Sequence, residues 1–129
     1  MTILDKDPWS PLHAMTQRGA MIVPEIISTS QTLVARKPNN TENGTVPAGF
    51  YFVIPINAME LTLPAAPALG DTIVITDIAN LAGTFATKPR IMRNGQLIQG
   101  KAEDLVFDVN NGSVKLVYSN TTYGWRLTY

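Results

Sequence analysis

Asp71 and Asp77 are the residues whose type and spacing first suggest chemistry, because paired carboxylates can act as acid and base or hold a cation. They lie in the stretch LPAAPALGDTIVITD, residues 63–77. If Thr72–Thr76 is a strand, the two carboxylates lie at its opposite ends, about 20 Å apart at about 3.3 Å per residue. The carboxyl pairs of glycoside hydrolases lie within about 10 Å of each other. The spacing therefore argues against a catalytic pair.

Other catalytic groups are scarce in this chain. His13 is the single histidine, and there is no cysteine. A nucleophilic site would depend on His13, which lies in a segment without strand alternation, whereas catalytic groups need rigid support. Asp104 and Asp108 have no histidine beside them, and no run of residues resembles a calcium-binding or phosphate-binding loop. We expect no catalytic residue, no metal site, no cofactor and no enzymatic activity.

The charge balance restricts the classes of partner. Ten basic residues face ten acidic ones in 129 residues, whereas nucleic-acid and anionic-membrane surfaces attract proteins with basic patches. No apolar run approaches the roughly 20 residues of a transmembrane helix. The first residues also lack the basic and apolar regions of a secretory signal. We expect a protein made in the cytoplasm that neither binds nucleic acid nor inserts into a membrane.

Alternation of apolar residues predicts strands along most of the chain. MELTL, LVFDV, VKLVY and WRLTY, which begin at residues 59, 105, 114 and 125, each place alternate apolar residues on one face. Further expected strands are Leu33–Arg36, Tyr51–Ile54, Thr72–Ile78, Arg90–Arg93 and Gln96–Ile98. No convincing helical period is present. The pattern predicts a chain made almost wholly of strands.

Turn residues separate the apolar runs. Asn43-Gly44, Asn94-Gly95 and Asn111-Gly112 predict hairpins, because both residues of the pair adopt positive φ readily, and Tyr123-Gly124 marks a further turn. Short strands connected by such turns are typical of β-sandwiches and barrels. We expect an all-β fold, an antiparallel β-sandwich of jelly-roll-like or Greek-key type.

The first 30 residues have a different character. DKDPWSPLHAMTQRG contains two prolines and no alternation, and the apolar run AMIVPEIIS is interrupted by Pro24. Large apolar residues on a free tail would form a sticky surface, so we expect this tail to dock. The sequence predicts a docking arm at residues 1–30 and a β-sandwich domain at residues 31–129. The residues expected to dock on a partner are Trp9, Met21, Ile22, Val23, Ile26 and Ile27.

Four aromatic residues gather near the C-terminus. Tyr118, Trp125 and Tyr129 are in phase with the expected core faces of their strands. Tyr123 lies in a turn instead, where an aromatic ring can stack on a sugar. It is the expected contact for a ligand such as a host-surface glycan.

Three segments carry a resemblance to a known family: LTLPAAPALGDTIVITDIAN, then PRIMRNGQLIQGKAEDLVFDVNNGSVKLVY, then YGWRLTY. Together they resemble a β-module of tailed-phage virion appendage proteins, of the tail fibre and baseplate type, over about residues 58–129. The resemblance implies a non-enzymatic structural role, usually as a homotrimer, and no catalytic residues. Positions that match the pattern are expected to define the fold, among them Pro64, Gly70, Asp71, Asp77, Gly95, Gly124 and Trp125.

The leading hypothesis is a virion structural protein that self-associates and anchors to other virion proteins through its N-terminal arm. It would be made in the host cytoplasm and located in the virion. One alternative is a capsid decoration protein, which would share the plan of an arm and a β-domain. Another is a carbohydrate-binding receptor module that uses Tyr123.

Overall fold

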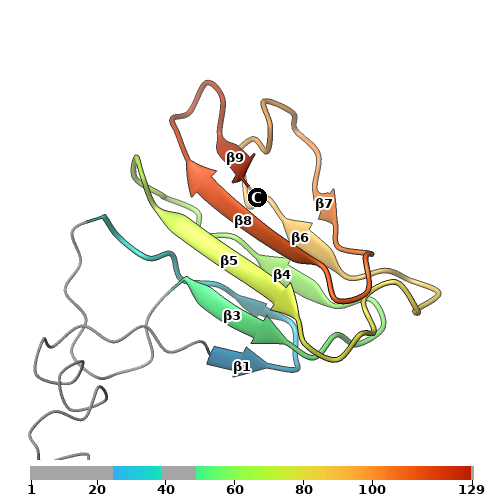
Figure 1. Ribbon diagram of the computed structural model, residues 1–129. Coiled ribbons are helices and arrows are strands. Elements are labelled where there is room, and N and C mark those ends of the chain that lie inside the picture. Colours follow the sequence, from blue (N-terminus) through green and yellow to red (C-terminus); the bar gives the residue numbers. More distant parts are fainter. Residues whose placement is uncertain (1–24, 39–48, 129) are drawn as a thin grey trace, which may run out of the picture.

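The computed structural model describes residues 25–38 and 49–128, which form nine strands and no helix (Figure 1). A five-stranded sheet has the order β1-β3-β5-β8-β9, and a four-stranded sheet has the order β2-β4-β6-β7. The all-β prediction is confirmed. The strands are β1 (Glu25–Ile27), β2 (Gln31–Thr32), β3 (Phe50–Val53), β4 (Glu60–Thr62), β5 (Thr72–Asp77), β6 (Arg90–Met92), β7 (Leu105–Val106), β8 (Ser113–Tyr118) and β9 (Trp125–Thr128).

Both sheets are mixed, so the expectation of an antiparallel sandwich is wrong. The pairs β1–β3 and β3–β5 are parallel in the larger sheet, and β2–β4 and β4–β6 are parallel in the smaller one. The antiparallel pairs are β5–β8, β8–β9 and β6–β7. From β1 to β6 the chain alternates between the sheets, so successive strands of one sheet run in the same direction. Jelly rolls and Greek keys consist of antiparallel strands, so neither describes β1 to β6.

The strands β1 to β6 form three successive coils, each with one strand in each sheet. Tyr51 pairs with Glu25 on one side and Ile75 on the other, and Leu61 pairs with Gln31 and Ile91. Paired residues in successive coils are thus 24 to 30 positions apart in the sequence. This separation falls within the range of about 20–45 residues for the repeats of solenoid proteins. The antiparallel strands β7, β8 and β9 then close the C-terminal side of the stack.

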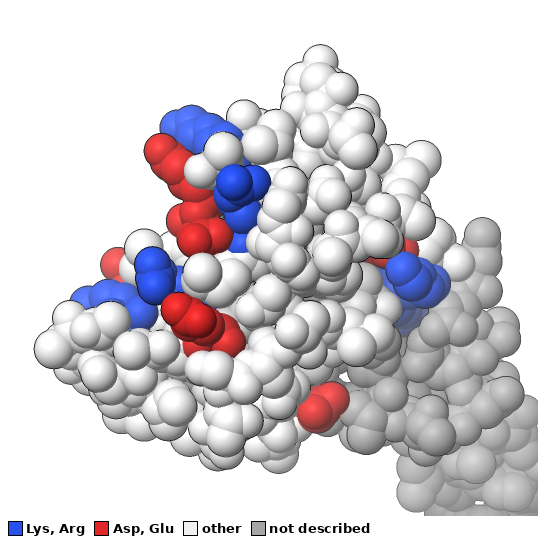
Figure 2. Space-filling model, turned by 180° about the vertical axis from the view of Figure 1, so that it is seen from behind, with Lys and Arg blue, Asp and Glu red and all other residues white. Residues whose placement is uncertain are grey.

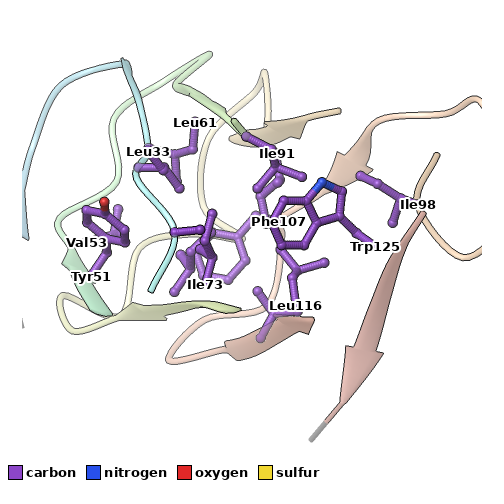
Figure 3. Packing of buried hydrophobic residues seen from close by; sticks show 14 of the residues in the cluster. Leu33, Tyr51, Val53, Leu61, Ile73, Ile91, Ile98, Phe107, Leu116 and Trp125 are labelled. Carbon is purple, nitrogen blue, oxygen red and sulfur yellow. The ribbon is translucent and has the colours of Figure 1, made fainter. Parts of the chain in front are cut away.

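Side chains from both sheets meet in one core (Figure 3). Ile73 and Ile75 of β5 are fully buried, as the alternation predicts. Tyr118 and Trp125 are also buried, with their ring centroids 5.3 Å apart and their planes at 67°, an edge-to-face arrangement. Tyr129 lies outside the described residues. Tyr118 and Trp125 are therefore in the core, as their phase in the sequence predicts.

The folded domain begins earlier than residue 31. Glu25–Ile27 form β1 and pair with β3, because Ile27 can bury its side chain against the core. Ile27 is 3% exposed and therefore belongs to the core instead of a docking surface, whereas Ile26 on the opposite face is 63% exposed. Residues 25–30 thus need reassigning from the arm to the domain. Residues 1–24, with Trp9, Met21, Ile22 and Val23, lie outside the described residues.

Two of the expected turns lie in connections between neighbouring antiparallel strands. Tyr123-Gly124 lies in the connection between the antiparallel strands β8 and β9. Asn94, Gly95 and Asn111 have the expected positive φ of 50°, 87° and 57°. Asn94-Gly95 lies in the long connection between β6 and β7 and not in a tight hairpin, because Gln96–Ile98 forms no strand, and Asn111-Gly112 makes no hairpin. The strand β6 pairs with β7, and β7 and β8 lie in different sheets. Asn43-Gly44 lies outside the described residues.

Several expected strands are shorter or displaced. Gln96–Ile98 forms only an isolated bridge at Ile98, and the strand expected at Leu33–Arg36 is observed at Gln31–Thr32. In LVFDV the strand ends at Val106, and Val109 is 64% exposed instead of in phase with the core. A strand extends only as far as its neighbour offers backbone partners, which alternation within one segment does not reveal.

Candidate functional site

Asp77 is a buried carboxylate whose oxygens are all used by the backbone. Its Oδ2 accepts hydrogen bonds from the N–H groups of Leu81 and Ala82 at 2.9 Å and of Asn111 at 3.1 Å, and its Oδ1 accepts from Ala79 at 2.9 Å. Burial by itself raises the pKa of Asp77, but the four N–H donors outweigh it and hold the pKa below its ordinary value. The residue is an ionised anchor for two loops.

Asp71 anchors the other end of β5. It is fully buried, and its Oδ2 accepts hydrogen bonds from the Ala68 N–H at 2.9 Å and from the Lys37 ammonium at 2.6 Å. Gly70, just before it, has a φ of +88°, as its expected role in the turn requires. Asp71 and Asp77 share no hydrogen-bond partner among the described residues. The two carboxylates lie at opposite ends of β5, as their spacing predicts, and each accepts the N–H of a residue in the adjoining turn.

Residues 25–38 and 49–128 contain no group of three or more histidines, cysteines or acidic residues placed to hold a metal. Asp104 closes a turn, because its Oδ1 accepts the backbone N–H of Arg93 at 2.9 Å. His13 lies outside the described residues. No helix in the described part of the chain is long and apolar enough to cross a membrane. The features of the described surface that could bind a partner are three.

The first surface is an exposed apolar patch on the outer face of the five-stranded sheet. Ile26 of β1 lies beside Phe52 of β3, and Ile54 lies beside Ile78, whose N–H donates to the Val53 carbonyl at 3.0 Å. Neighbouring strands lie about 4.8 Å apart and same-face residues about 7 Å apart along a strand, so these four side chains adjoin. Their exposed fractions are between 38% and 63%. We call Ile26, Phe52, Ile54 and Ile78 the outer apolar patch.

The outer face of the four-stranded sheet is different in character. There Glu60 of β4 pairs with Arg90 of β6 at 3.2 Å, with both side chains about half exposed. Figure 2 shows the molecule from behind, with acidic and basic side chains next to one another instead of in patches of one sign. The apolar patch is thus a property of one sheet, not of the whole surface.

The second surface is a groove between the last described strands of the two sheets. Two adjoining hollows share Leu105 of β7 and Leu127 of β9. Each of these strands is the last of its sheet. We call this hollow the β7–β9 groove. Its apolar lining consists of Leu105, Val106, Phe107, Val109, Val114, Leu127 and Ile98, with Lys101, Glu103 and Asp104 at one end.

The third surface surrounds Tyr123, the expected ligand contact. Tyr123 is 57% exposed in the β8–β9 connection and lines a shallow depression with Ser119 and Arg126. The Asn120 side chain accepts N–H groups of Thr122 and Tyr123 at 3.0 and 2.9 Å, which orders the turn. The depression thus offers one aromatic ring, one hydroxyl and one guanidinium.

Sequence reasoning found Ile26 and Tyr123 but missed the other exposed apolar residues. The run FYFVIPI, residues 50–56, is apolar on both faces of its strand, and that is the available signal for Phe52 and Ile54. Nothing local marked the β7–β9 groove, because it forms between strands distant in sequence. A scan of protein-family models and a search of curated proteins each found no match to this chain.

Proposed function

We propose that this chain is a structural protein of a tailed-phage virion, a tail fibre or baseplate component that associates with copies of itself. The observation that supports this most is the outer apolar patch. Soluble monomers rarely expose large contiguous apolar surface, and such patches mark association sites. A flat sheet face with four adjoining apolar side chains suits contact with another protein better than capture of a small ligand.

The architecture supports a mechanical role. Among the described strands, β1 is the last of the larger sheet and β2 the last of the smaller one, so each has an edge without a described partner on the side of the first coil. Open edges are surfaces to which another chain can add. The balanced charge of ten basic and ten acidic residues also avoids repulsion between copies. We propose that the two sheets are the layers of a sandwich-like building block and that residues 1–24 form its docking arm.

The molar mass of the full chain in solution tests the proposal. We expect the mass of a homotrimer by light scattering, with the outer apolar patch buried between copies. The variant Phe52→Ser/Ile54→Ser should lower the mass towards a monomer while the circular dichroism spectrum stays unchanged. Leu69→Ser is the matched control, because Leu69 is 74% exposed and lies outside the patch. A wild-type chain that stays monomeric at high concentration would refute the proposal.

The exposed ring of Tyr123 favours one alternative, a carbohydrate-binding module. Tyrosine rings stack on sugars, and the Arg126 guanidinium supplies hydrogen-bond donors beside it, whereas the Ser119 hydroxyl already donates to the Gly124 carbonyl at 2.6 Å. A glycan array probed with the wild type and Tyr123→Ala separates the two functions. Binding lost in the variant would favour the receptor module, and absence of binding to any host-surface glycan would remove it.

A further inference from the structure

We infer that the β7–β9 groove binds residues 20–24 of a second copy of this chain, so that the copies join head to tail. This inference rests on the proposed function, because it names a surface through which copies associate. It follows from the chemistry of the groove, the open edge of β7 and the distance between the two ends of the larger sheet.

The groove exposes apolar surface that the described residues leave uncovered. Val106 and Val109 on its lip are 47% and 64% exposed, although Phe107 between them is buried. Leu105 and Leu127 from the two sheets are only partly buried. Covering these side chains would remove apolar area from water and stabilise a complex. The lining favours an apolar occupant.

The edges of the groove favour an extended segment. On β9, the Trp125 backbone already pairs with Leu97 and Gln99, and the Leu127 N–H donates to the Gln99 side chain at 3.2 Å. By contrast, β7 has β6 as its one neighbour among the described strands. An extended chain that enters the groove can therefore pair with β7 and add a strand to the smaller sheet, as peptides do at free sheet edges.

Residues 20–24 have the composition that such a site requires. Met21, Ile22 and Val23 are three consecutive apolar residues, and Pro24 lacks the N–H that would continue a ladder. They lead directly into β1, which is the other edge strand of the larger sheet. A short apolar run that ends at a proline therefore directly precedes β1.

Distance assigns this segment to a different copy. Between β1 and β9 there are four strand spacings, about 19 Å at about 4.8 Å each. Val23 is two residues before Glu25 and Met21 is four, so they extend at most about 7 and 14 Å from β1. Val23 therefore reaches neither β9 nor β8, which lies three spacings or about 14 Å from β1, so the segment as a whole does not fit the groove of its own copy. It does reach the groove of a neighbour whose β9 edge lies beside β1. Such a contact is heterologous and makes a closed ring or an open filament.

Disulfide trapping tests this arrangement, because the chain has no cysteine of its own. Full-length Ile22→Cys and Val109→Cys chains are made with different masses, mixed and oxidised. We expect a disulfide-linked pair containing one chain of each kind. Leu69→Cys replaces Val109→Cys as the control, since it is exposed outside the groove, and it should give little of the mixed product.

A charge placed in the groove gives an independent readout. Val106→Glu should raise the dissociation constant of the assembly by about tenfold or more, with an unchanged unfolding temperature because Val106 is half exposed. Leu69→Glu should change neither quantity.

The outcomes separate the groove inference from the proposed function. If wild-type copies assemble but the mixed disulfide never exceeds the amount formed in the control, the groove inference is wrong and the proposed function stands. Monomeric wild type would overturn both. A disulfide that forms within a single diluted Ile22→Cys/Val109→Cys chain would overturn the second-copy assignment.

Discussion

The backbone N–H of Asn111 donates a hydrogen bond to Oδ2 of Asp77 at 3.1 Å, across 34 positions of sequence. It ties the turn that precedes β8 to the end of β5, two strands that pair antiparallel in the larger sheet. The same carboxylate holds the loop after β5 through the N–H groups of Leu81 and Ala82. One buried charge therefore fixes both connections at this end of the sheet.

Asp77→Asn should destabilise the protein by about 2–3 kcal/mol. The backbone N–H donors lose a charged acceptor, and some of them would face the NH₂ group of the amide, which is itself a donor. Urea unfolding followed by circular dichroism measures the change in free energy. Asp108→Asn is the matched control, since Asp108 is exposed. Equal stability of both variants would show that the hydrogen bonds to Asp77 contribute nothing net.

The contribution of Asp77 should depend on pH in a defined direction. Its folded-state pKa is lowered from the ordinary 3.8, so the unfolded chain binds the proton more readily. The stabilisation is therefore fully present above about pH 4–5 and is lost as pH falls through the folded-state pKa. The difference in unfolding free energy between the wild type and Asp77→Asn should shrink on acidification below pH 4. A difference that grows in acid would contradict the assignment.

Tyr51→Phe should cost about 0.5–1.5 kcal/mol, the usual net contribution of a hydrogen bond, because Val34 is 58% exposed and water can replace the hydroxyl. The Tyr51 hydroxyl donates to the Val34 carbonyl at 2.9 Å and accepts the Val34 N–H at 2.7 Å. The substitution removes the hydroxyl that pairs with both the N–H and the carbonyl of Val34, and it leaves the aromatic ring in place. Thermal unfolding compares it with Tyr123→Phe, which changes an exposed ring and should be neutral.

Gly124→Ala should be more damaging than Gly95→Ala. Both glycines have positive φ, +73° and +87°, so each substitution strains the backbone by about 1 kcal/mol. Only at Gly124 would the new Cβ clash with a backbone atom, the Leu97 carbonyl oxygen, whereas at Gly95 nothing lies within 4 Å. Comparing the two midpoints of denaturation isolates the steric term. Identical midpoints would show that the loop at Leu97 moves aside.

Deletion of residues 1–24 should leave a cooperatively folding domain, because β1 and the buried Ile27 are retained. Deletion of residues 1–30 removes both and should lower the free energy of unfolding by about 2–4 kcal/mol, in the range for loss of a buried isoleucine. Both truncated chains should fail to form the assembly of the full chain. A folded and fully assembled 25–129 chain would exclude a docking role for residues 1–24.

Local patterns were sufficient for many elements. Ile73, Ile75, Leu116 and Tyr118 are buried as their alternation predicts, since successive side chains of any strand point to opposite faces. The roles of Gly70, Asp71 and Asp77 also followed from the sequence, because turns draw on a small set of residue types. These properties depend on a few neighbouring residues.

Strand partners and exposed surfaces depended on the tertiary structure. The parallel pairing of Tyr51 with Glu25 and Ile75 requires the chain to cross between sheets, and no residue of β3 encodes that path. Tyr51 lies on the side of β3 that packs against the second sheet and is buried, whereas Phe52 lies on the other side and is exposed, although both are aromatic. Alternation in the sequence determined that these segments form strands and that they are half buried. The tertiary structure decided which edges and faces stay open, because that depends on contacts between residues far apart in the chain.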